Sequence, residues 1–186
     1  MKYYSQKDSR WSSQQLGDCN DTIGNAGCKV SCFAMLISDK IKNPNGTMSE
    51  STPSIVDWIA TKKSLYSNGC LINDKIFSNY FDLEYNGKST EAPDYPCIAE
   101  TDHYKDKGFA QHFFIHLPNG QIIDPLDKDP KKKDNPYNIV SYRLIKPKGY
   151  SENVNCEDCY ERLNEANKII KDLEKKLKEI NNISKI

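Results

Sequence analysis

Cys28 is the cysteine whose surroundings best suit a nucleophile. It follows Asn25-Ala26-Gly27 and immediately precedes a stretch with apolar residues at helical spacing, so we expect it to begin a helix. The N-terminus of a helix stabilises a thiolate through its free N–H groups and its dipole. Gly27 would also let a substrate backbone approach the sulfur closely. Cys32 lies one turn further along and is expected to be an inert core thiol.

A cysteine nucleophile also needs a histidine within hydrogen-bond reach. His112 begins the apolar stretch HFFIHL, which is typical of a strand, and we assign it as the general base. His116 follows four residues later on the same face, and we expect it to be a satisfied core or surface histidine. His103 falls in a polar loop and is expected to be solvated.

Asp124 is the residue that we expect to orient this histidine. It ends a second strand pattern, and the segment Pro118-Asn119-Gly120 between the two strands is a strong hairpin turn signal. Such a hairpin pairs positions whose numbers add up to about 238, which places Asp124 opposite residue 114 and close to His112. The sequence therefore predicts a triad of Cys28, His112 and Asp124.

The elements that must hold these residues change in type along the chain. Helical patterns come first, at Cys28 and after Thr52-Pro53, where Thr52 is the expected N-cap and Pro53 the first helical residue. Strand patterns follow over residues 96–99, 112–117, 121–123 and 139–145. Helices followed by an antiparallel sheet predict an α+β domain.

The composition excludes some classes of function. The 186 residues carry 26 basic and 26 acidic side chains, a formal net charge of +0, so no long-range field would attract nucleic acid. The lysines at 131–133 lie among aspartates and are expected to form a solvated loop. No apolar run approaches the ~20 residues of a membrane span. We expect no cofactor and no metal.

The seven cysteines indicate a reducing compartment with mostly free thiols, because an odd number does not suit a fully paired disulfide framework. Cys70 and Cys97 are expected to be packing residues, and Cys19 lies in a loop. The N-terminal stretch MKYYSQKDSRW lacks the features of a signal peptide. We therefore expect a chain that is cytoplasmic when made and that is released by lysis or packaged in a particle.

Three regions can be separated along the chain. Residues 1–145 form the expected domain, residues 146–155 a linker, and residues 156–186 a C-terminal helix. Apolar residues in this helix recur at steps of three and four, which predicts a short coiled coil. It would either form a homo-oligomer through residues 160–182 or pack on its own domain. Cys156 and Cys159 at its start are expected to be exposed thiols, with inter-chain disulfides as the alternative.

Four blocks of the chain occur in the order and spacing of a known family. They are YYSQKDSRW from residue 3, TIGNAGCKVSCFAM from residue 22, QHFFI from residue 111 and IDP from residue 123. Together they resemble the bacteriocin-processing-peptidase-like branch of the papain-like cysteine peptidases. The resemblance covers about residues 3–145. The chain departs from the family's usual pattern at Gln111, where glycine is common, and at Lys29 and Val30, where small residues are common.

The resemblance implies a papain-like fold, in which a helix that bears the nucleophile packs on an antiparallel sheet. It implies Cys28 as nucleophile, His112 as base and Asp124 as the orienting acid. It adds Gln6 as the residue whose side-chain amide helps to form the oxyanion hole, and Trp11 as a packing residue near the site. Without the resemblance, Gln6 would be a polar residue at the start of a strand.

The expected function is a cysteine-type peptidase that hydrolyses a peptide or isopeptide bond through a thioester acyl-enzyme. The substrate would be a protein or a cell-wall peptide, and the composition would suit a bacterial or phage enzyme such as a peptidoglycan hydrolase. The alternative is a catalytically silent peptidase-fold module that binds peptide and oligomerises through its C-terminal helix. Transfer through the same acyl-enzyme, in place of hydrolysis, stays open.

Overall fold

The computed structural model describes residues 1–37, 40–42, 44–102, 111–147 and 176. By its internal contacts the chain divides into two units, Met1–Tyr150 and Ser151–Ile186, and all described residues except Lys176 belong to the first. The expected C-terminal helix, most of the linker, Cys156, Cys159 and His103 lie outside the described residues.

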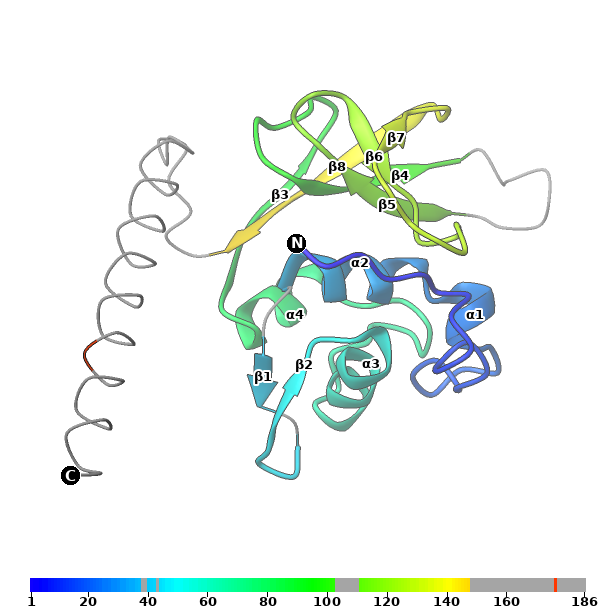
Figure 1. Cartoon of the computed structure of the whole chain (residues 1–186), viewed down its shortest axis with the longest axis vertical. Coiled ribbons are helices and arrows are strands. Elements are labelled where there is room, and N and C mark those ends of the chain that lie inside the picture. Colours follow the sequence, from blue (N-terminus) through cyan, green and yellow to red (C-terminus); the bar gives the residue numbers. More distant parts are fainter. Residues whose placement is uncertain (38–39, 43, 103–110, 148–175, 177–186) are drawn as a thin grey trace. The chain divides into compact units, whose positions relative to one another are not determined.

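The first unit is an α+β structure with an antiparallel sheet, which confirms the predicted class. Helices and strands follow one another in this order: α1 (Ile23–Ala26), α2 (Cys28–Ile37), β1 (Lys40–Lys42), β2 (Met48–Glu50), α3 (Pro53–Lys62), α4 (Asp74–Tyr80), β3 (Leu83–Ser89), β4 (Cys97–Thr101), β5 (His112–His116), β6 (Gln121–Ile123), β7 (Lys133–Asp134) and β8 (Ile139–Pro147). The helices lie on one side of the main sheet (Figure 1).

The main sheet has the strand order β3-β8-β4-β5-β6-β7, with antiparallel neighbours throughout. The hairpin between β5 and β6 has the predicted register, because Ile115 pairs with Ile123 and His116 with Ile122. Gly120 in its turn has a φ of 81°, a conformation that glycine adopts without steric cost. This hairpin brings the end of β6 back to the start of β5.

Helix α2 lies between α3 and the sheet (Figure 1), and it contacts β4, β5 and β8. All its residues from Cys28 to Leu36 are buried, as expected of a helix that is apolar on nearly all sides. Its apolar side chains join those on one face of the sheet, such as Phe113 and Ile115, in a single core. Cys28 is thereby fixed at the boundary of the helices and the sheet.

The helix α3 begins as predicted. The Thr52 hydroxyl accepts a hydrogen bond from the N–H of Ile55, and Pro53 is the first helical residue. The Asp57 carboxylate, buried in the same helix, accepts hydrogen bonds from the Gly17 N–H and the Tyr66 hydroxyl. These bonds hold the loop that leads to α1 and α2.

Several elements were not predicted from the sequence. They are α1, β1, β2, α4, β3 and β7. Strand β8 continues to Pro147, so residues 146 and 147 belong to the sheet and not to a linker. Lys133 lies in β7 and forms ion pairs, so the expectation of a solvated loop was wrong for this residue. No helix in the described part of the chain has the length and apolar character needed to cross a bilayer.

Cys19 and Cys70 form a disulfide bond, so the expectation of free thiols was wrong for both, and Cys70 is not a simple packing residue. Their Cα atoms are 5.3 Å apart although 51 residues separate them in sequence. The bond links the loop before α1 to the loop between α3 and α4. Three further cysteines in the described part of the chain, Cys28, Cys32 and Cys97, are free and buried.

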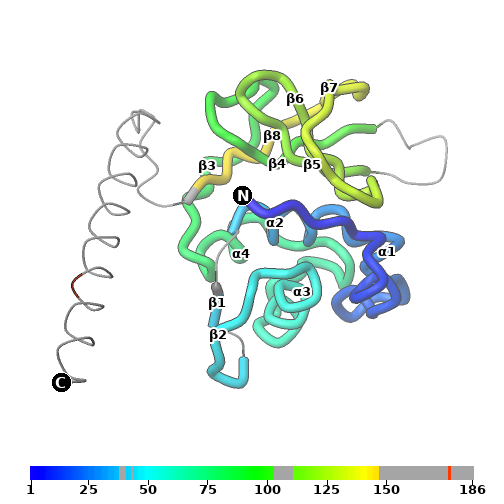
Figure 2. The backbone as a smooth tube through the Cα atoms, in the orientation of Figure 1, coloured from blue at the N-terminus to red at the C-terminus, as the bar shows by residue number. Residues whose placement is uncertain are grey.

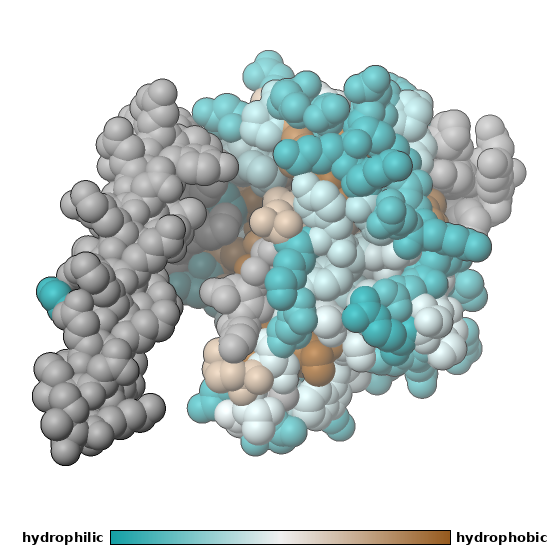
Figure 3. All heavy atoms as spheres, in the orientation of Figure 1, coloured by the Kyte–Doolittle hydropathy of each residue, from teal (hydrophilic) through white to brown (hydrophobic). Residues whose placement is uncertain are grey.

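The visible face of the first unit is covered mainly by hydrophilic side chains (Figure 3). Large exposed apolar side chains are scattered, and they include Met48, Ile76 and Tyr80. Helix α2 covers the apolar side chains on one face of the sheet. On the other face Tyr137 and Tyr142 pack against Phe114.

Candidate functional site

Cys28 is the first residue of α2, as the sequence predicted. The short helix α1 precedes it, and Gly27 connects the two helices. A Cβ at position 27 would lie 2.4 Å from the carbonyl oxygen of Ile23, so the glycine is required by this close approach within the chain. The first N–H groups of a helix have no partner within it, and the Cys28 N–H is one of them. Cys28 is buried, with 8% of the residue exposed.

His112 and Asp124 form a buried hydrogen-bonded pair. The distance between His112 Nε2 and Asp124 Oδ1 is 2.9 Å, and the side chains are 4% and 1% exposed. The hairpin register explains this pairing, because it places Asp124 just past β6 and beside the start of β5. Nε2 donates to Asp124, and Cys28 lies close enough to the imidazole to act on the pKa of His112.

The charge of His112 follows from these two partners. Burial alone would lower its pKa, but the hydrogen bonds with Asp124 and Cys28 and their negative charges outweigh burial and raise the pKa to about 9. His112 therefore holds a proton at neutral pH, directly beside the sulfur of Cys28.

Besides His112, further groups contact the Asp124 carboxylate. The Tyr137 hydroxyl donates to Asp124 Oδ2 at 2.5 Å, and the Leu126 N–H donates to Oδ1 at 2.9 Å. The Lys133 ammonium lies 3.6 Å from Oδ2 and also pairs with Asp127. Burial would raise the pKa of Asp124, but the hydrogen bonds from His112 and Tyr137 and the charge of His112 lower it to about 2. The carboxylate therefore stays ionised and keeps one orientation.

Tyr137 and Lys133 were not identified from the sequence. The Tyr137 ring also packs edge-on against the imidazole of His112, with ring centroids 5.9 Å apart. Neither residue belongs to a motif: Lys133 lies in β7, which pairs with β6, and Tyr137 lies between β7 and β8. An aspartate that ends a strand gives no sign of which later side chains will surround it.

Gln6 lies next to this group on the N-terminal segment, which Figure 2 shows passing across α2 towards α1. Its N–H donates to the carbonyl oxygen of Pro125 at 2.8 Å, which ties it to the residue after Asp124. The buried side-chain amide donates one N–H to the carbonyl oxygen of Gly24 at 3.0 Å. A second N–H remains on the same nitrogen, and it can be donated to another group.

Other sequence candidates are placed away from this constellation. Cys32 is fully buried, and burial raises its pKa well above the usual value, as expected of an inert core thiol. His116 is buried with its ring 5.1 Å from that of Tyr142, and its Nδ1 has no hydrogen-bond partner among the described residues. Trp11 is buried and donates to the carbonyl oxygen of Ser5, so it supports the segment that carries Gln6.

Replacing Asp124 with asparagine is expected to lower the pKa of His112 from about 9 towards its usual value of 6.5. The variant keeps the shape of the side chain but removes the negative charge that stabilises the imidazolium. An NMR titration of the His112 ring measures this directly. Asp129→Asn, at an exposed aspartate, removes the same charge elsewhere and should leave the titration unchanged. An unchanged pKa in Asp124→Asn would show that Asp124 does not control His112.

Comparisons with known proteins add no information about this site. In the described part of the chain, no three or more cysteine, histidine or acidic side chains are grouped as metal ligands would be. No family model matches the chain, and no curated protein or solved structure is significantly similar to it.

Proposed function

We propose that the protein is a papain-like cysteine peptidase that hydrolyses a peptide or isopeptide bond through a thioester acyl-enzyme. The observation that carries the proposal is the buried His112–Asp124 pair, with Cys28 near the same imidazole at the start of a helix. A nucleophile, a base and an orienting carboxylate in this chain of contacts are what acyl transfer requires.

The reaction would begin with Cys28 as a thiolate and His112 as an imidazolium. The sulfur attacks the carbonyl carbon of the scissile bond, and the resulting oxyanion accepts hydrogen bonds from the Cys28 N–H and from the second N–H of the Gln6 amide. His112 then donates its proton to the leaving amine as the C–N bond breaks, which leaves a thioester on Cys28. Water attacks the thioester while His112 takes a proton from it, and the carboxylic acid product leaves as the thiolate is regenerated.

Asp124 and Tyr137 have positioning roles in this scheme. Asp124 keeps Nε2 of His112 protonated and the ring in one orientation, so the other nitrogen exchanges its proton with Cys28 and the leaving group. Tyr137 fixes the carboxylate that does so. We further propose a protein or a cell-wall peptide as substrate and a bacterial or phage origin, as the sequence patterns indicate. Homo-oligomers through residues 160–182 belong to the same proposal.

Selective alkylation of Cys28 tests whether the site is active. We expect iodoacetamide at neutral pH to modify Cys28 much faster than Cys32 or Cys97, because Cys28 lies near the His112 imidazole and is 8% exposed, whereas Cys32 and Cys97 are fully buried. Site-resolved mass spectrometry of the modified peptides measures each rate. His112→Ala should slow the modification of Cys28 and leave the other two unchanged.

The alternative, a catalytically silent peptide-binding module, gives the opposite result. If Cys28 reacts no faster than the fully buried Cys32, then the imidazole does not activate the sulfur and the peptidase proposal fails. The comparison uses two thiols of the same helix in the same protein, so differences in folding or reagent do not affect it.

A further inference from the structure

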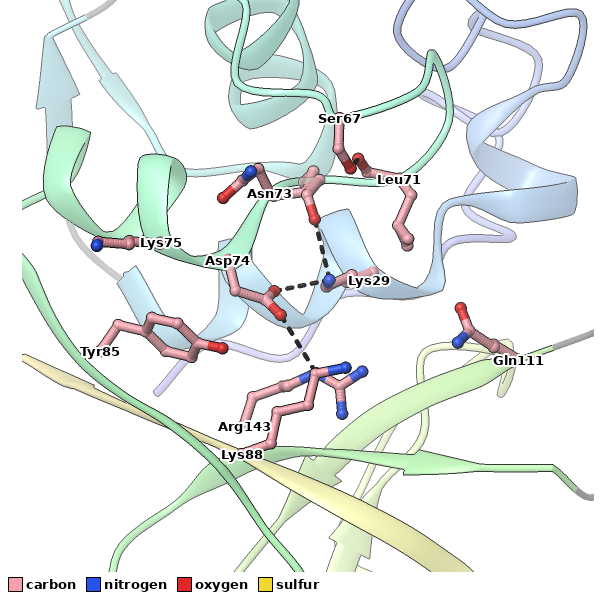
Figure 4. Close-up of a pocket in the computed structure, with 11 residues that line it drawn as sticks. Lys29, Ser67, Leu71, Asn73, Asp74, Lys75, Tyr85, Lys88, Gln111 and Arg143 are labelled. Carbon is pink, nitrogen blue, oxygen red and sulfur yellow. Dashed lines mark hydrogen bonds and ion pairs between the residues drawn. The ribbon is translucent and has the colours of Figure 1, made fainter.

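A pocket of about 260 Å³ lies between α2, the loop before α4 and the sheet (Figure 4). Lys29, the residue after the nucleophile, and Gln111, the residue before the base, both line it. Because the chain neighbours of both Cys28 and His112 line it, we expect a substrate segment next to the scissile bond to reach this pocket. Its size suits a single side chain.

Lys29, Asp74 and Arg143 line the pocket and form a buried charge cluster with Glu100, which is not among the lining residues. The Lys29 ammonium lies 2.6 Å from Asp74 Oδ1 and donates to the carbonyl oxygen of Ile72 at 3.0 Å. Arg143 Nε lies 3.2 Å from Asp74 Oδ2, and its Nη2 lies 2.7 Å from Glu100 Oε2. Two cations and two carboxylates balance one another in this cluster, so it needs no further counter-ion.

The lysines at the mouth of the pocket leave an excess of positive charge. Lys75 and Lys88 are exposed and line the pocket, and neither forms an ion pair within the described ranges of the chain. Of the charged residues that line it, four are cations and one, Asp74, is an anion. A site with this balance attracts a negatively charged group.

Lys88 is the cation placed most clearly for such a group. It is the direct cross-strand partner of Arg143 in the pairing of β3 with β8, and Figure 4 shows the two side chains next to each other. Like charges directly opposite each other destabilise a sheet unless an anion compensates them. Burial lowers the pKa of Lys29, and although Asp74 opposes this, the charges of Arg143 and Lys88 lower it further, so these cations do repel one another.

We propose that this pocket is the specificity subsite of the Cys28 site and that it binds the carboxylate of an acidic residue, glutamate or aspartate, in the peptide substrate. The inference rests on the proposed function and adds the chemical class of substrate to it. Lys88 supplies the uncompensated charge. Lys29 retains one ammonium hydrogen beyond its two partners, and the Arg143 guanidinium retains N–H groups for a planar carboxylate.

Hydrolysis of paired peptide pools tests the preference. Each pool is random except for one fixed position, which is glutamate in one pool and its uncharged isostere glutamine in the other, and the products are quantified by mass spectrometry. We expect kcat/KM to be about 10-fold higher for glutamate at one position beside the scissile bond, as a hydrogen-bonded charge in a pocket can provide. Lys88→Glu should abolish or reverse this ratio. The control Lys131→Glu makes the same charge change at an exposed site outside the pocket and should keep the ratio.

Binding to the Cys28→Ala variant of the full chain separates this proposal from the proposed function. Fluorescein-labelled glutamate and glutamine peptides are compared by anisotropy, with and without Lys88→Glu. Preferential glutamate binding that Lys88→Glu removes, together with no hydrolysis by the unmodified protein, would support the pocket and overturn the peptidase. Hydrolysis with equal rates for both peptides would overturn the pocket and leave the peptidase. An unchanged ratio in Lys88→Glu would overturn the pocket, and neither binding nor hydrolysis would overturn both.

Discussion

Replacing Cys28 with alanine is expected to reduce peptide hydrolysis by at least about 10⁴-fold, the size of loss seen when the nucleophile of such a triad is removed. The reason is that no other group in the site can form the acyl-enzyme: Cys32 is fully buried one turn further along α2, and His112 is occupied by Asp124 and Cys28. Initial rates on a peptide pool or on purified peptidoglycan measure the loss. His112→Ala should give a loss of similar size, because the leaving amine would then depart without a proton.

Cys32→Ala is the matched control for this experiment. It removes a thiol from the same helix, at a position that the triad does not use, so turnover should stay close to that of the unmodified protein. Circular dichroism and thermal unfolding of both variants show whether the fold is kept. Undiminished turnover in a folded Cys28→Ala variant would place the nucleophile elsewhere.

Asp74→Asn is expected to lower the free energy of unfolding by about 3–5 kcal/mol, the cost of breaking a buried ion pair from one side. The side chains of Lys29, Arg143 and Asp74 are 7%, 2% and 10% exposed, so solvent cannot replace the lost carboxylate. Lys29 and Arg143 would then face each other with Glu100 as the remaining anion in the cluster. Denaturant unfolding monitored by circular dichroism measures the change.

Asp94→Asn is the control for the loss of charge, because Asp94 is an exposed aspartate of the same domain. It should change the free energy of unfolding by less than about 0.5 kcal/mol, as surface substitutions usually do. A small effect of Asp74→Asn as well would mean that Lys29 loses its proton at little cost, in the direction in which burial already moves its pKa. The cluster would then not stabilise the contact between α2, α4 and the sheet.

The sequence was sufficient to predict the parts of the site that depend on local rules. A glycine followed by an apolar helical pattern placed Cys28 at the start of α2, and a Pro-Asn-Gly turn predicted the register that brings Asp124 to His112. Hairpin geometry and helix initiation involve residues that are close in the chain, so their consequences can be read without the rest of the fold. The α+β class followed from the change in periodicity in the same way.

The expectations that failed concern residues that are far apart in the chain. The number of cysteines suggested free thiols, but Cys19 and Cys70 are brought together by packing across 51 residues. Tyr137 and Lys133 also contact Asp124, and Lys133 does so from β7, which pairs with β6. None of these contacts leaves a pattern in the sequence, because each depends on the path of the whole chain.

The residues of the proposed triad and the hairpin that joins two of them were therefore predicted from the sequence alone. The tertiary structure decided which groups keep Asp124 ionised and that the pKa of His112 is raised to about 9. It also decided that four cations, among them the neighbour of Cys28 in the chain, line one pocket. The physical reason is the same in each case. The pKa of a group and the charge of a pocket depend on burial and on neighbouring charges, and only the folded chain sets both.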